Sequence, residues 1–152
     1  MPKLRQGLLM GIVLLLPLTA QAQLASCSVS TLAVSFGAID PGQASATDAA
    51  GTVTVTCSGL SLIPYDVALS AGSGAYAQRT MRSGASTLNY NLYTSPTYNT
   101  IWGDGSGGTS RVSGSITLLV NPGVHPVYAL VPGNQNVAPG TYTDSITVTV
   151  TY

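Results

Sequence analysis

Two segments alternate strictly between apolar and hydroxyl-bearing side chains, and this pattern constrains the fold more than any other feature of the chain. Residues 52–57 read Thr-Val-Thr-Val-Thr-Cys, and residues 146–152 read Ile-Thr-Val-Thr-Val-Thr-Tyr. Successive side chains of a β-strand point to opposite faces of its sheet. Each segment therefore predicts a strand with one buried face and one exposed face.

Weaker runs of the same kind occur at residues 65–69, 88–92, 116–120 and 127–131, and no segment of useful length has helical periodicity. Pairs and triplets of Pro, Gly, Asn and Asp separate the runs and mark turns. About seven short strands separated by such turns predict an all-β, antiparallel β-sandwich.

The first strand is less regular, because its apolar residues change phase along the chain. Cys27 and Val29 share one face, whereas the apolar residues from Leu32 onward fall on the other. This slip predicts a bulge, or a switch between sheets, near residues 30–31.

The N-terminal segment predicts export. Lys3 and Arg5 precede an apolar run at residues 7–18, and Ala-Gln-Ala at residues 20–22 is typical of a signal-peptidase site. We therefore expect a signal peptide over residues 1–22 and one mature domain over residues 23–152. No later stretch reaches the roughly 20 apolar residues needed to cross a membrane, so direct membrane insertion is not expected.

Charge and cysteine content limit the partners and the chemistry. The predicted mature chain has three arginines, five aspartates, no lysine and no glutamate, a net charge of −2. Such a chain does not favour nucleic acid or anionic lipid as a partner. Two cysteines in an exported protein predict a disulfide between Cys27 and Cys57, and Cys57 shares the apolar face of its strand.

The last predicted strand carries no charge, proline or bulge that would protect its edge. An apolar strand left as an open edge favours aggregation. We therefore expect another polypeptide to cover it.

Several segments resemble the spore coat protein U domain family, which is shared with subunits of archaic, Csu-type chaperone-usher pili. Each is short, but their order and spacing match the family over essentially the whole mature chain. The segments are Cys27 with residues 34–37 (VSFG), and residues 51–58 (GTVTVTCS), 79–81 (RTM), 88–93 (LNYNLY), 102–105 (WGDG) and 140–152 (GTYTDSITVTVTY).

The resemblance implies an incomplete immunoglobulin-like, pilin-type sandwich that lacks its last strand and receives a donor strand. The implied partners are a periplasmic chaperone, an outer-membrane usher and other pilus or coat subunits, and the implied final location is the cell surface. Cys27 and Cys57 should hold one groove wall to the core. The candidate residues of the acceptor groove are Ile146, Val148, Val150 and Tyr152, with Leu32, Val34 and Phe36 on the opposite wall.

The segment before Cys27 bears on where such a subunit would sit. Only residues 23–26 separate the predicted cleavage site from Cys27, whereas a donor strand needs about ten residues of alternating character. The chain is therefore expected to accept a strand rather than donate one, as a tip subunit, a minor subunit or a coat component.

Enzymatic chemistry is not expected, and neither is a cofactor or a metal. The segment at residues 103–108 (GDGSGG) superficially resembles a serine-protease motif, but the single histidine, His125, lies downstream of it. A catalytic triad needs a base beside its nucleophile, and one histidine without a free thiol makes a poor zinc site. Asp144, near the start of the last strand, is interpreted as structural.

Aromatic residues suggest a candidate site for attachment to a surface and an alternative function for the chain. Tyr98, Ile101 and Trp102 form a candidate exposed loop patch for attachment, and residues 62–64 form a second. The alternative to a structural subunit is an autonomous secreted carbohydrate-binding sandwich that uses exposed aromatic side chains. A hydrolase is the third and least favoured possibility.

Overall fold

The computed structural model describes residues 25–40, 42–59, 62–117 and 122–152. These residues form strands, turns and loops, and none of them forms a helix that could cross a membrane. The predicted signal peptide, and Leu118 and Val120 of the predicted strand at 116–120, lie outside the described residues.

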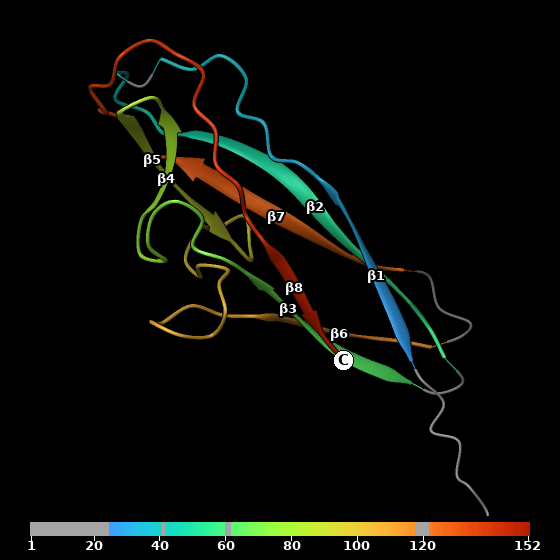
Figure 1. Ribbon diagram of the computed structural model, residues 1–152. Coiled ribbons are helices and arrows are strands. Elements are labelled where there is room, and N and C mark those ends of the chain that lie inside the picture. The colour runs from blue at the N-terminus through green and yellow to red at the C-terminus, as the bar shows by residue number, and fades with distance from the viewer. Residues whose placement is uncertain (1–24, 41, 60–61, 118–121) are drawn as a thin grey trace, which may run out of the picture.

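Eight strands form two antiparallel sheets that stack as a sandwich (Figure 1). The five-stranded sheet has the order β1-β2-β7-β5-β4, and the three-stranded sheet has the order β6-β3-β8. The strands are β1 (Ser26–Leu32), β2 (Thr47–Ser58), β3 (Ile63–Leu69), β4 (Arg79–Ser83), β5 (Ser86–Tyr93), β6 (Val112–Ile116), β7 (Gly123–Val131) and β8 (Val148–Thr151).

The core lies between the inner faces of the two sheets. Alternate residues of β2, β3, β5 and β7 point inward, and Val55, Val67 and Ala129 are completely buried. Trp102, in the loop after β5, is also fully buried, and its indole Nε1 donates a hydrogen bond to the Val67 carbonyl at 3.0 Å. The predicted sandwich is confirmed.

The disulfide between Cys27 and Cys57 is confirmed and links β1 to β2. The two cysteines are direct cross-strand partners in the β1–β2 ladder. Both pack against the hydrophobic core at its edge. The bond therefore fixes the edge strand β1 to the central part of its sheet.

The phase change in the first strand occurs later than predicted. The β1–β2 ladder runs without interruption to the pair Leu32 and Thr52, so it contains no bulge at residues 30–31. Beyond Leu32 the chain passes over Gly51, where an added Cβ would lie 2.6 Å from the Leu32 carbonyl oxygen. Val34 then packs inward, so the change of face lies between Leu32 and Val34.

Three strands differ from the sequence-based expectation. β6 spans Val112–Ile116, whereas the predicted strand at residues 116–120 begins where β6 ends. β4 was not predicted as a strand, because it is short and carries two arginines within five residues. β7 begins at Gly123 and includes Pro126, although proline usually marks a strand boundary. Pro126 is tolerated because β5 pairs with only three residues of β7, Tyr128 to Leu130, so Pro126 pairs with β2 alone.

Replacing both Cys27 and Cys57 with serine should lower the free energy of unfolding by about 3 to 4 kcal/mol, because the bond closes a loop of about 30 residues in the unfolded chain. Urea unfolding of the oxidised chain and of the double variant measures the difference. Equal unfolding midpoints would contradict a stabilising role for the bond.

Candidate functional site

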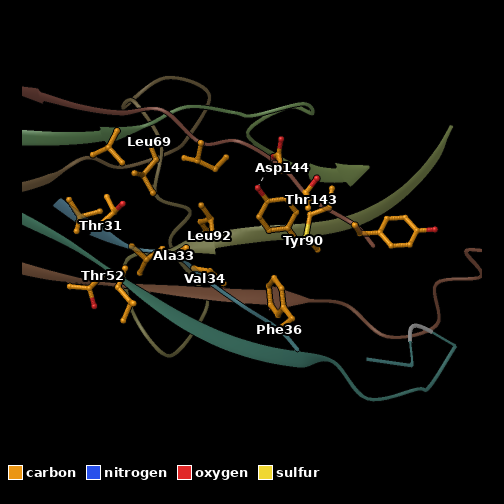
Figure 2. A pocket seen from close by; sticks show the side chains of 17 residues that line it. Thr31, Ala33, Val34, Phe36, Thr52, Leu69, Tyr90, Leu92, Thr143 and Asp144 are labelled. Carbon is orange, nitrogen blue, oxygen red and sulfur yellow. Dashed lines mark hydrogen bonds between the residues drawn. The ribbon is translucent and has the colours of Figure 1, made fainter. Parts of the chain in front are cut away.

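An apolar groove opens between the two sheets, along the edges formed by β1 and β8. Its volume is about 310 Å³. Figure 2 shows side chains from opposite sides of the opening pointing toward one another across it. The groove is lined by Thr31, Leu32, Ala33, Val34, Phe36, Thr52, Val53, Leu69, Met81, Tyr90, Leu92, Val127, Tyr142, Thr143, Asp144, Ile146 and Val148.

One wall is the segment 142–150, in which burial alternates at every residue. Ile146, Val148 and Val150 are half-buried and pack against the core, whereas the threonines between them are exposed. β8 is the edge strand of its sheet and pairs with β3 on one side. Its second side borders the groove, so the described part of this sheet leaves that backbone edge without a ladder partner.

The opposite wall is the segment that follows β1. Val34 and Phe36 are half-buried against the core, and the Phe36 ring meets the Tyr90 ring edge to face at 6.4 Å between centroids. Leu32 also borders the groove, but 70% of its surface is exposed, because it shares the outer face of Thr52. Tyr152 is 55% exposed beyond the lined region.

Asp144 ties the first wall to the loop after β3. Its Oδ1 accepts hydrogen bonds from the backbone N and the Oγ of Ser73 at 2.9 and 2.8 Å, and its Oδ2 accepts one from the Tyr90 hydroxyl at 2.7 Å (Figure 2). A side chain on Gly72 would collide with this carboxylate. Burial, followed by the bond to Asp144, raises the pKa of Tyr90, so its hydroxyl stays a donor. The structural interpretation of Asp144 agrees with these contacts.

A buried arginine links the loops after β3 and β5 to strands β4 and β5, which carry groove residues. Arg79 has no exposed surface, and its guanidinium donates to the Ser70 carbonyl (3.0 and 2.8 Å), the Trp102 carbonyl (2.7 Å) and Asn91 Oδ1 (2.6 Å). Burial lowers the pKa of Arg79, but an arginine retains its proton at neutral pH. Carbonyl oxygens thus satisfy a buried cation, and they tie two loops to β4 and β5.

The sequence did not predict the polar contacts of Arg79 or of the Tyr90 hydroxyl. Arg79 and the core residue Met81 lie two residues apart in β4, so their side chains point to the same inner face. An arginine on the inner face of a strand is the signal that could have identified Arg79 as a buried residue. Tyr90 lies in the apolar phase of the predicted strand at residues 88–92, which accounts for its buried ring but not for the bond that its hydroxyl makes.

The predicted exposed loop patch is wrong for Trp102, because its side chain is fully buried. Tyr98 and Ile101 are half-buried. In the second predicted patch, Leu62 is 60% exposed but Ile63 is buried.

The protease-like segment does not come together with the histidine. Ser106 donates its hydroxyl to Asp104 Oδ1 at 2.6 Å within a turn, and this bond lowers the pKa of Asp104. His125 instead hydrogen-bonds the Tyr65 hydroxyl at 2.8 Å and meets the Trp102 ring edge to face. Burial lowers the pKa of His125, so the neutral ring belongs to the packing between the sheets.

Two antiparallel sheets, a disulfide on the edge strand and a groove between the sheet edges define a pilin-type β-sandwich. The family model described as the Spore Coat Protein U domain matches residues 14–149, and the chain belongs to that family. The chain is 35% identical over 143 residues to Protein U of Myxococcus xanthus, covering 84% of this chain and 78% of that protein.

One solved structure supports the fold assignment. The chaperone-tip adhesion subunit pre-assembly complex CsuC-CsuE, from archaic chaperone-usher Csu pili of Acinetobacter baumannii, contains a chain with a TM-score of 0.58 and 25% identity. The match covers 85% of this chain but 40% of that one. The minor tip subunit HdaB of the E. coli Hda pilus gives a TM-score of 0.43 at 17% identity, covering 81% of this chain and 79% of that one.

Replacing Arg79 with methionine should lower the free energy of unfolding by about 3 kcal/mol or more, because buried carbonyls would lose their donors. Thermal or urea unfolding measures the loss. The matched control is Arg82→Met on the same strand, where the exposed side chain makes one hydrogen bond of 3.4 Å, and a change within about 0.5 kcal/mol is expected. Equal losses for the two variants would contradict the role of Arg79.

Asp144→Ala should lower the free energy of unfolding by about 1 to 2 kcal/mol, because Ser73 and Tyr90 would lose a shared acceptor at a partly exposed site. Asp66→Ala is the matched control, because its carboxylate accepts a bond from the exposed Ser113 hydroxyl. If Asp66→Ala were as costly as Asp144→Ala in urea unfolding, the proposed link between the wall and the loop would be wrong.

Proposed function

We propose that the chain is a non-enzymatic structural subunit of a bacterial pilus or spore-coat-like surface assembly, and that its groove accepts a β-strand from another polypeptide. The observation that carries the proposal is the alternation of burial along residues 142–150, together with the edge of β8 that has no ladder partner among the described residues. An inserted strand would satisfy both requirements of this wall, because it supplies ladder hydrogen bonds and covers alternate side chains.

The groove fits a strand better than a compact ligand. Its lining follows an extended path from Thr31 to Phe36 on one side and from Tyr142 to Val148 on the other. About four inserted apolar side chains, at roughly 1.5 to 3 kcal/mol each, would give gross stabilisation on the order of 10 kcal/mol before ordering costs. That energy is comparable to the whole stability of a typical domain, so a chain with an empty groove should be much less stable than the same chain with an inserted strand.

Family membership and the likeness to a tip adhesion subunit held by its chaperone support the choice of donor. By analogy, a periplasmic chaperone would fill the groove first and another subunit would replace it, with an outer-membrane usher as the site of exchange. The predicted signal peptide fits this route to the cell surface. The four residues predicted to precede Cys27 favour a tip, minor or coat position over that of a donor within a long fibre.

A donor strand fused after Tyr152 through a glycine-serine linker should convert the chain into a stable monomer. The fused strand would contain ten residues that alternate valine or isoleucine with threonine. A control fusion has the same composition but groups its apolar residues together. The alternating fusion should raise the unfolding midpoint in urea well above that of the control, and equal midpoints would contradict strand acceptance.

Paired wall variants locate the strand. In the alternating fusion, Val148→Asp should lower stability strongly, because it places a charge against the inserted side chains. Thr149→Asp on the exposed face of the same strand should have little effect. If Val148→Asp prevents folding, Val148→Ala provides the same comparison with a smaller loss.

A further inference from the structure

Three tyrosines gather on the outer face of the five-stranded sheet. Tyr93 of β5 and Tyr128 of β7 are direct cross-strand partners. The neighbouring pair, Leu92 and Ala129, is buried in the core, so both tyrosines lie on the opposite, outer face. Tyr98 meets Tyr93 edge to face, with 5.4 Å between ring centroids and 81° between ring planes. We name these three residues the tyrosine cluster.

The loop that carries Tyr98 holds it in a conformation that side chains rarely adopt. Its φ of 53° lies in the left-handed region, which is unfavourable for a residue with a bulky side chain. Hydrogen bonds from Thr94 N to the Thr100 carbonyl (3.1 Å) and from Tyr98 N to the Ser95 carbonyl (3.2 Å) fix the loop. Such strain tends to persist where a side chain must be presented for a function.

Asp48 gives the tyrosine cluster a polar partner. Asp48 of β2 is the cross-strand partner of Leu130 in β7, which lies two residues from Tyr128. The Asp48 side chain therefore lies on the same outer face of the sheet as Tyr128, and it is exposed. Burial, and then the charge of Asp48, raise the pKa of Tyr98, which is consistent with their proximity. Tyr128 is paired with the exposed Ala50, and this small side chain leaves that flank of the tyrosine ring open.

The charge of this surface selects among partners. Arg82, the arginine on the outer face of β4, pairs with Thr87, six residues along β5 from Tyr93. That separation is about 20 Å along an extended strand, so Arg82 does not offset the charge of Asp48. The Asp48 carboxylate disfavours phosphates and acidic polysaccharides at this surface, whereas an uncharged, hydroxyl-rich partner is complementary to it.

We propose that the tyrosine cluster and Asp48 form a binding surface for an uncharged polysaccharide. Tyrosine rings supply flat, rigid contact area with a polar tip, which suits the apolar face of a sugar ring. The Asp48 carboxylate would accept charge-assisted hydrogen bonds from sugar hydroxyls. The surface lies on the side of the sheet opposite the groove, so the proposal does not depend on strand acceptance.

Native gels cast with soluble polysaccharides test the proposal on the full exported chain. The probes are a neutral β-glucan, a neutral galactomannan and, as the acidic counterpart, alginate. At least one neutral probe should retard the chain while alginate does not. Tyr98→Gly should weaken this affinity about tenfold, as expected for the loss of one stacked ring, and glycine suits the backbone at this position.

Two further variants separate stacking from damage to the fold. Tyr98→Phe keeps the ring and should retain most of the affinity. Val124→Ala, at an exposed position on the same face of β7, should bind like the unmodified chain. The proposal is overturned if neither neutral probe retards the chain, if alginate alone does so, or if Tyr98→Gly binds as tightly as Tyr98→Phe.

Discussion

Backbone pairing along the groove is the constraint on which the rest of the structure depends. A sheet edge that becomes buried needs hydrogen-bond partners for its N–H and C=O groups, and β8 combines such an edge with an apolar inner face. The remainder of the sandwich holds β8 and the segment after β1 on opposite sides of the groove. The disulfide secures the β1 side, and Asp144 secures the other.

Polar contacts inside the sandwich fix the positions of the loops next to the groove. The described residues contain a fully buried arginine whose partners are carbonyl and amide oxygens rather than a carboxylate. Such an arrangement fixes loop positions through geometry, because each oxygen must lie at a defined angle to the planar guanidinium. A groove whose floor and walls are fixed in advance loses less entropy when a strand enters.

Sequence predicted the elements whose signal is local. Period-two alternation identified β2, β8 and their inward residues, and the cysteine count identified the disulfide. Nonlocal features were harder to predict. Trp102 was predicted to lie in an exposed patch, yet its indole donates a hydrogen bond to the Val67 carbonyl of the three-stranded sheet. The polar contacts of Arg79 and Tyr90 were not predicted for the same reason, because their hydrogen-bond partners lie in other elements. The cluster around Tyr98 depends on the β5–β7 register, which alternation alone does not specify.

Hydrogen exchange at the backbone amides of residues 145–150 tests strand acceptance most directly. In the isolated mature chain, the amides that face away from β3 should exchange rapidly, because they have no ladder partner. In the complex with a strand-donating chaperone or subunit, the same amides should become strongly protected, while those bonded to β3 change little. Full protection of the whole segment in the isolated monomer would contradict the account.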